Sequence, residues 1–318
     1  PIFRNNGSGI PCLVLHDRIA PKLIENFKSL EKAQSWIPCE QFFKNVPAII
    51  QLNWLDRVLI DRLELKIETI KTTLYATENH WEEAFYHLLA RNFGLKVNAD
   101  PFEALARSLP LNLLARHKSN PMQLEALFFG QSGFLEVSFE EAWPRLLARE
   151  YRHLAHKYDL TPMERGQWKF LRMRPSGFPT IRLAQFASLI HQSDHLFSKL
   201  LETNSLREIE HLFHVQPSDY WKNHFQFDKA SKGIEKCLSK DFIHLIVINT
   251  IVPFMFHYGK IRGLPQVQKR ALEFLEALPP ESNHILDAWE NLGITARNAF
   301  QSQALIHLKT RYCDQKNC

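Results

Sequence analysis

Apolar residues recur at helical spacing from about Pro21 onward, and this pattern constrains the fold more than any other feature of the chain. Between residues 46 and 75, for example, Trp54, Val58, Leu63 and Ile67 lie four or five positions apart, on one face of a helix. Further helices are expected at 81–93, 100–108, 121–129, 139–157, 179–191, 194–202, 205–213, 240–261, 265–276, 282–291 and 295–312. No fixed repeat period indicates a solenoid. The sequence therefore predicts a mainly α fold, a multi-helix antiparallel array.

The first residues are the exception to this helical pattern. The stretch PIFRNNGSGIPCLVLHD reads as a strand, an Asn-Gly turn and a second strand, so we assign residues 1–18 to a short β-hairpin. A lone two-stranded hairpin is marginally stable in water. We therefore expect residues 1–18 to be the remnant of a missing N-terminal domain, and residues 19–318 to form one all-helical domain.

The composition is that of an ordinary globular protein, with 45% hydrophobic and 23% charged residues. The 5 cysteines are scattered and form no disulfide framework, which favours a reducing, cytoplasmic location. The most apolar run, FIHLIVINTIVPFMF at 242–256, is too short and too polar to span a bilayer. We predict a buried core helix there, kinked at Pro253, and no membrane partner.

Positive charge is concentrated in one stretch of the chain. The whole sequence carries 39 Lys and Arg against 34 Asp and Glu, a net charge of +5. Between Arg152 and Arg182 there are seven basic and two acidic residues, so this stretch alone equals the net excess. A net charge of this size spread evenly says little about partners, whereas a local concentration indicates an anionic ligand.

Four cations surround a helix break in WKFLRMRPSGFPTIRLAQF (168–186): Lys169, Arg172, Arg174 and Arg182. Two prolines and a glycine interrupt the chain there, and the next helix begins near Pro179 with free N-terminal amides. Guanidinium groups bind phosphate and carboxylate bidentately, and a lysine adds a longer-reaching charge. We therefore predict that these four residues bind an anion. The alternative is that the arginines pair with carboxylates elsewhere and join two helical layers.

His224 lies in YWKNHFQF (220–227), a stretch that mixes aromatic and polar side chains. Such a stretch can stack nucleic-acid bases, as in single-strand binders, and His224 is therefore included in the predicted nucleic-acid site. The residues themselves favour the alternative, an aromatic helix that packs on a neighbour with His224 satisfied locally.

Cys313 and Cys318 in the C-terminal YCDQKNC are the candidate metal ligands. Their spacing partly resembles that of iron–sulfur and zinc sites, but two thiols do not complete such a site. We therefore expect no metal and no cofactor in residues 1–318. The sequence contains no phosphate-binding glycine loop, nucleophile elbow or zinc-protease motif, so no complete catalytic motif identifies an enzyme.

Several long segments carry a resemblance to a known family: WEEAFYHLLARNFGLKVNADPFEALARSLP, EALFFGQSGFL, WKFLRMRPSGFPTIRLAQ, YWKNHFQFD, INTIVPFMFHYG and SQALIHLKTRYC. Over nearly its whole length the chain resembles a family of uncharacterised proteins, mostly from Bacteroidota, catalogued as a domain of unknown function. The resemblance implies an upstream segment with an aspartate motif and a glutamate-x-histidine motif, spaced as in a metal-dependent nuclease. It also implies a further cysteine after Cys318, and a divalent metal only in the full-length protein.

We therefore predict an auxiliary helical domain of a nuclease-like bacterial protein that binds nucleic-acid phosphates through residues 168–182. Two alternatives stay open. One is a protein-interaction scaffold in which the arginines are structural. The other is an enzyme for a small phosphorylated or carboxylated substrate, with His224 as the acid or base beside Arg172 and Arg174. The oligomeric state is left open.

Overall fold

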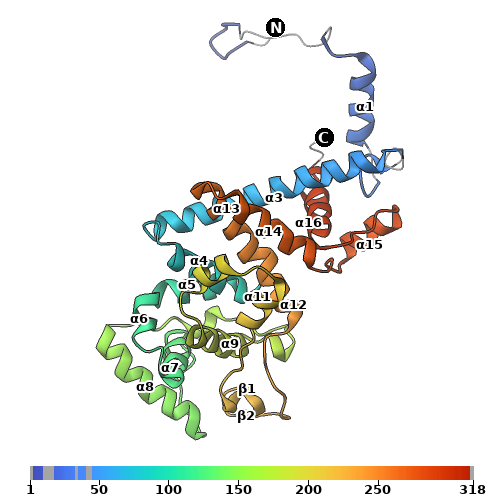
Figure 1. Ribbon diagram of the computed structural model, residues 1–318. Helices are drawn as coiled ribbons and strands as arrows, with labels where there is room; N and C mark the ends of the chain where they lie inside the picture. Colours follow the sequence, from blue (N-terminus) through green and yellow to red (C-terminus); the bar gives the residue numbers. More distant parts are fainter. Residues whose placement is uncertain (1–2, 10–17, 33–34, 41–44, 316–318) are drawn as a thin grey trace. The chain divides into compact units, whose positions relative to one another are not determined.

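The computed structural model describes residues 3–9, 18–32, 35–40 and 45–315 (Figure 1). Over these residues the fold is mainly α, as the sequence predicts, and the described strands form one short antiparallel pair. The chain divides into two compact units, one of residues 1–60, 280–297 and 301–318 and the other of residues 61–279 and 298–300. The boundary expected between residues 18 and 19 borders positions outside the described set and stays a prediction.

Part of the expected N-terminal hairpin lies within the described residues. Phe3 pairs with Gly9 in an isolated antiparallel bridge, across a turn in which Gly7 has a φ of +78°. This left-handed conformation is open to glycine at little cost, which agrees with the Asn-Gly signal. The second strand, expected at 10–17, lies outside the described residues.

The first unit contains α1 (Pro21–Lys32), the start of α3 (Ala48–Ala76), α15 (His284–Asn291) and most of α16 (Ala299–His307), which continues as the π-helical turn Leu308–Cys313. Its core is built around Trp289, which is fully buried. The Trp289 indole N–H donates to the Leu305 carbonyl at 3.1 Å, and Trp36 packs edge-on against the ring at 5.1 Å between centroids. This aromatic pair links the chain around residue 36 to the C-terminal helices of the same unit.

The helices of the second unit are α4 (Trp81–Phe93), α5 (Ala99–Ser108), α6 (Leu111–Ala115), α7 (Pro121–Gln131), α8 (Ala142–Tyr158), α9 (Pro179–Gln192), α10 (Leu196–Glu202), α11 (Leu206–Leu212), α12 (Lys240–Ile246), α13 (Val252–Arg262) and α14 (Pro265–Ala277). Helices α4, α7 and α9 form the core, because most of their side chains are buried all round rather than on one face. The ring of Phe186 on α9 lies 4.8 Å from that of Phe93 on α4 and 5.5 Å from that of Phe128 on α7. One aromatic cluster therefore joins the three core helices.

Helices α7 and α8 approach each other closely at Gly130. A Cβ atom at this position would lie 1.9 Å from Cγ of Tyr151, far inside van der Waals contact. The Tyr151 ring is held in place because its hydroxyl donates to Oε1 of Gln131 at 2.9 Å. Glycine is therefore required at position 130 by packing, not by backbone conformation.

One helical run in the described part of the chain, Lys240–Arg262, is long and apolar enough to cross a membrane, with a mean hydropathy of 1.5. In the structure 78% of its most apolar window is buried inside the protein, so the run is a core helix, as predicted. Where the sequence led us to expect a kink at Pro253, the backbone forms the π-helical turn Val247–Ile251, in which the Val252 N–H donates to the Val247 carbonyl.

The described β-sheet lies where the sequence predicts no strand. Strands β1 (His224–Gln226) and β2 (Lys229–Ala230) pair antiparallel, directly after the 3₁₀ turn Asp219–Asn223. Strands this short contain too few residues to show an alternating apolar pattern, and the sequence pattern therefore did not predict them. In the turn between them, the Asp228 carboxylate accepts from the backbone N–H groups of Glu140 and Glu141 at 2.9 and 3.1 Å, and so holds the two residues directly before α8.

Candidate functional site

The loop between α8 and α9, residues 159–178, is held by one side chain and by its backbone rather than by its charges. Trp168 is buried, and its indole N–H donates to the Ser132 carbonyl at 2.9 Å. The backbone N–H of Lys169 donates to Oδ1 of Asn98 at 2.8 Å, and its carbonyl accepts from Nδ2 of Asn98 at 3.0 Å. The path of the loop is therefore fixed without ion pairs from Lys169, Arg172 or Arg174.

Three of the predicted cations, Lys169, Arg172 and Arg174, are exposed. None of them forms an ion pair with a carboxylate in the described ranges. Arg172 has a φ of +62°, a left-handed conformation that is uncommon for a residue with a bulky side chain. The loop thus presents three unneutralised cations to solvent, which is the arrangement that binding to phosphate requires.

Helix α8 extends this positive charge with a basic face that the sequence analysis counted only from Arg152 onward. Six exposed basic residues lie along it: Arg145, Arg149, Arg152, His153, His156 and Lys157. Its arginines and lysine form no ion pair with any carboxylate that the structure describes. Like charges three or four residues apart repel one another on a helix. The signal was present in the spacing of Arg145, Arg149 and Arg152 on a predicted helix, but a charge count that began at Arg152 left the first two out.

We call residues 145–174 the basic segment. It contains the exposed cations Arg145, Arg149, Arg152, Lys157, Arg165, Lys169, Arg172 and Arg174. Against these stand three acidic residues, Glu150, Asp159 and Glu164, of which Glu150 accepts a hydrogen bond from Nε2 of Gln123 at 2.7 Å. The segment therefore carries a strong local excess of positive charge at neutral pH.

Arg182 lies apart from these exposed cations. It is largely buried on α9, its guanidinium stacks on the Phe242 ring at 3.5 Å, and Nη1 donates to Oε1 of Gln185 at 3.0 Å. No described carboxylate pairs with it, Nε has no partner, and burial lowers the pKa of Arg182 to about 10. The first turn of α9 is buried as well. Thr180 in this turn is 2% exposed, and its hydroxyl donates to the Phe225 carbonyl at 2.5 Å. The structure therefore places Arg182 and the α9 N-terminus inside the fold.

Replacing Arg182 by methionine is expected to leave the free energy of unfolding within about 1 kcal/mol of wild type, or to raise it, because a buried charge without a carboxylate is replaced by an apolar chain of similar length. Arg182→Ala, which loses the packing on Phe242 as well, should lower it by about 2 kcal/mol. Urea denaturation measures both. An equal loss in the two variants would mean that the charge itself is needed.

The His224 side chain forms hydrogen bonds and a ring contact within the fold. Its Nε2 lies 3.0 Å from Oε1 of Glu141 and its Nδ1 lies 2.8 Å from the Tyr220 carbonyl, so both ring nitrogens have partners. The ring stacks on Tyr220 at 4.0 Å with the planes 1° apart, and the Tyr220 hydroxyl also binds Glu141. The stretch 220–227 therefore joins the hairpin to the start of α8, in place of an open aromatic wall.

A cavity of about 920 Å³ lies in the second unit, lined by the end of α3, the start of α4, residues 107–118 and residues 190–196. No residue of the basic segment or of 168–182 lines it. Sequence reasoning missed this cavity because its walls come from separate helices with no shared motif. An enzyme site for an anionic substrate beside the arginines therefore draws no support from it.

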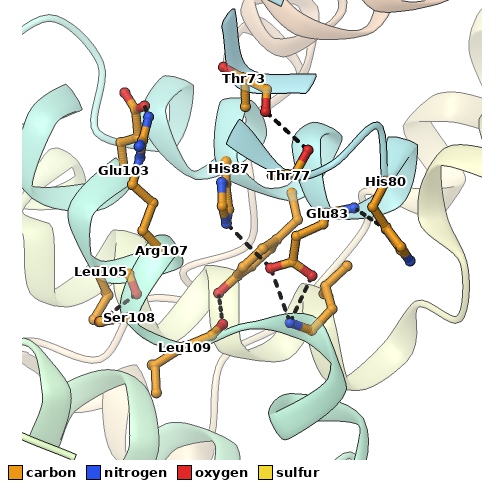
Figure 2. A network of polar contacts seen from close by, with 12 residues as sticks. Thr73, Thr77, His80, Glu83, His87, Glu103, Leu105, Arg107, Ser108 and Leu109 are labelled. Atoms are coloured by element: carbon orange, nitrogen blue, oxygen red, sulfur yellow. Dashed lines mark hydrogen bonds and ion pairs between the residues drawn. The ribbon is translucent and has the colours of Figure 1, made fainter. Parts of the chain in front are cut away.

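The polar part of the cavity centres on Glu83. Figure 2 shows its carboxylate facing His87, with 3.3 Å between Oε1 and Nε2 of the imidazole. The backbone N–H of Leu111 donates to both carboxylate oxygens at 3.3 and 3.1 Å, and the N–H of Glu83 donates to Nδ1 of His80 at 3.1 Å. His87 is 8% exposed, and its Nδ1 is buried without a partner. The carboxylate is thus fixed in position at the cavity wall.

The described residues contain no group of three or more His, Cys, Asp or Glu side chains that could hold a metal ion. Of the two candidate ligands, Cys313 is half-buried in the π-helical turn at the end of α16, and Cys318 lies outside the described residues.

Comparison with models of protein families places the chain in a family. A family model described as a protein of unknown function (DUF2851) matches residues 1–284. No curated protein and no solved structure matches the chain.

Proposed function

The chain belongs to the DUF2851 family, and since that family carries no known function, we propose one from the charge distribution: the basic segment binds the phosphates of a nucleic acid. The observation that carries this proposal is that its cations are exposed and lack described carboxylate partners. Cations without carboxylate partners repel one another. A bound polyanion relieves this repulsion, because each cation then has a phosphate as its partner. The proposal is limited to binding, because these residues show no catalytic or metal-binding constellation.

The arrangement of the cations favours a polyanion over a small anion. The arginines of α8 follow one another every three or four residues, about 4.5–6 Å along the helix axis. A row of this kind meets successive phosphates, whereas a small anion needs converging groups and a closed pocket. The loop adds cations whose main chain is already fixed by Trp168 and Asn98.

The double variant Arg172→Ala plus Arg174→Ala is expected to weaken nucleic-acid binding on the order of a hundredfold at 50 mM salt. For duplex DNA, each neutralised phosphate contributes about 0.9 to the slope of log K against log salt, so the slope should fall by about 2. Fluorescence anisotropy with labelled single- and double-stranded DNA and RNA, from 50 to 300 mM KCl, measures both quantities and identifies the preferred polymer.

The matched control is Arg207→Ala plus Lys232→Ala, which removes the same charge from exposed positions outside the basic segment. It should leave affinity and slope close to wild type. Equal weakening by the two pairs would reduce the effect to net charge. No binding by the wild-type protein at 50 mM salt would contradict the proposal outright.

A second candidate, a protein-interaction scaffold, is supported by exposed apolar side chains in the first unit. Leu23 and Phe27 on α1 are 61% and 56% exposed, and Ile49, Ile50 and Trp54 near the start of α3 are 44% to 64% exposed. Large exposed apolar groups are typical of interaction surfaces. The scaffold alternative also calls for structural arginines, and among the predicted cations only Arg182 is built into the fold. It therefore explains less of the observed charge than nucleic-acid binding does.

A further inference from the structure

We propose that the cavity beside α4 binds a small organic cation, an apolar molecule that carries a protonated amine. The inference is independent of nucleic-acid binding, because the cavity and the basic segment share no residue. The volume of about 920 Å³ falls in the range of small-molecule sites. The class of ligand follows from three properties of the cavity: its negative charge, its carboxylates held by backbone amides, and its apolar wall.

The charge of the lining is negative once its internal pairs are counted. Four carboxylates line the cavity, namely Glu78, Glu82, Glu83 and Asp194, against the cations Arg107 and Lys118. Lys118 binds Asp194 and also donates to the Ser193 carbonyl at 2.5 Å. Arg107 binds Glu103, outside the lining, at 2.6 Å. Both cations are thus engaged, and the other three carboxylates have no lysine or arginine partner in the part of the chain that is described.

The two carboxylates of the first turn of α4 are fixed by backbone amides of other segments. Glu82 accepts from the N–H groups of Phe197 and Ser198 at 3.1 and 2.9 Å, and so caps the start of α10. Glu83 accepts from Leu111 N–H and faces His87. Carboxylates held in this way keep their position when a ligand enters, and in a partly enclosed cavity their field attracts a cation more strongly than in open water. Glu83, with 17% of its side chain exposed, is the group placed to meet an ammonium.

His87 provides an independent sign of a binding site at the same place. It lines the cavity, is more than nine-tenths buried, and its Nδ1 has no partner within the described structure. Buried polar atoms are nearly always hydrogen-bonded, so an unpaired ring nitrogen beside a cavity needs an explanation. Because Nδ1 is itself buried and Glu83 faces Nε2, a ligand donor would supply the missing partner only after the ring rotates toward the cavity.

The rim of the cavity holds backbone strain. Glu78 and His195, both lining residues, have φ values of +51° and +47°, and Asn79 between the lining positions has +61°. A left-handed conformation is unfavourable for residues with a Cβ and persists where the surrounding structure enforces it, often at ligand sites. A large part of the remaining wall is apolar, with Phe85, Leu89, Leu114, Ile190 and Leu196. An amine with an apolar body therefore matches both parts of the lining.

The test compares three probes of similar shape and different charge: 2-phenylethylamine, 2-phenylethanol and 3-phenylpropanoate. Isothermal titration calorimetry with the full chain should show saturable binding of the amine, weaker binding of the alcohol and none of the carboxylate. Glu83→Gln should weaken amine binding about tenfold or more, because a hydrogen bond to a charged group is replaced by one to a neutral amide. Glu273→Gln, exposed on α14 outside the cavity, is the matched control.

A second variant keeps the test valid if Glu83→Gln perturbs the fold. Ala115 lines the cavity and is exposed, so Ala115→Phe should obstruct the cavity and abolish amine binding without lowering the melting temperature. Equal affinity for the amine and the carboxylate would overturn the assignment of a cation. Absence of amine binding at 10 mM probe, or undiminished binding to Ala115→Phe, would overturn the site.

Discussion

Replacing Glu125 by glutamine is expected to raise the free energy of unfolding at pH 8 by about 3 kcal/mol. Glu125 lies on the core helix α7, is 4% exposed, and accepts hydrogen bonds from the Trp221 indole and from the Ser218 hydroxyl at 3.1 Å. Burial raises the pKa of its carboxyl from 4.5 to about 7, although these hydrogen bonds act in the opposite direction.

The effect of this shift on stability depends on pH in a defined direction. Between pH 4.5 and about 7 the native protein keeps a proton that the unfolded chain has released, so stability falls as pH rises through this window and is level above it. Each pKa unit corresponds to about 1.36 kcal/mol, which gives a total of about 3 kcal/mol. Glutamine can keep the hydrogen bond from Trp221 and never ionises, so the variant avoids this loss.

Urea denaturation at pH 4 and pH 8 measures the difference. Glu125→Gln should match wild type at pH 4 and exceed it at pH 8, with a flatter profile between. The control Glu202→Gln removes an exposed carboxylate at the end of α10 and should keep the wild-type slope. A Glu125→Gln protein less stable than wild type at pH 8 would mean that the ionised carboxylate stabilises the fold.

Replacing Gly130 by alanine is expected to lower the free energy of unfolding by about 2–3 kcal/mol. The new methyl group would lie 1.9 Å from Cγ of Tyr151 and 2.1 Å from Cδ2, so α7 and α8 must separate or the ring must leave its position. Leaving that position breaks the hydrogen bond from the Tyr151 hydroxyl to Gln131. The gain from the higher helix propensity of alanine, about 1 kcal/mol, offsets part of the loss.

Two further variants separate packing from the general effect of losing a glycine. Gly166→Ala is the control, because nothing lies within 4 Å of the added Cβ, and it should be neutral or slightly stabilising. In a double-mutant cycle, Gly130→Ala combined with Tyr151→Ala should be less destabilised than the sum of the single changes. A strictly additive result would contradict the proposed clash.

The helices were largely predictable from the sequence, because their signals are local. The helix expected at 81–93 is observed with those bounds, and its first turn carries Glu82 and Glu83. Its cap was not predicted: the ring of His80 accepts from the Glu83 N–H. The identity of a cap depends on backbone geometry at one residue, which periodicity does not report.

The positions that depend on distant segments were not predictable. Arg182 was expected to bind an anion near the start of its helix, but its guanidinium lies on the ring of Phe242, sixty residues later in the chain. The exposure of Lys169, Arg172 and Arg174 follows from the anchoring of their loop by Trp168 and Asn98, and neither anchor could be inferred from charge spacing. The cavity likewise combines the start of α4 with residues 190–196, and no local pattern describes a space between helices.

The contact between Asp228 and the chain directly before α8 has a consequence for the order in which this protein forms during translation. Asp228 binds the amides of Glu140 and Glu141, which precede it by 88 and 87 residues. A nascent chain whose Asp228 has not yet left the ribosome therefore lacks the contact that holds the two residues directly before α8, and the entry to the arginine-bearing helix reaches its final state only after the hairpin has been synthesised. Contacts with this sequence separation slow folding, so the surface that we assign to nucleic acid matures late in the life of the nascent polypeptide.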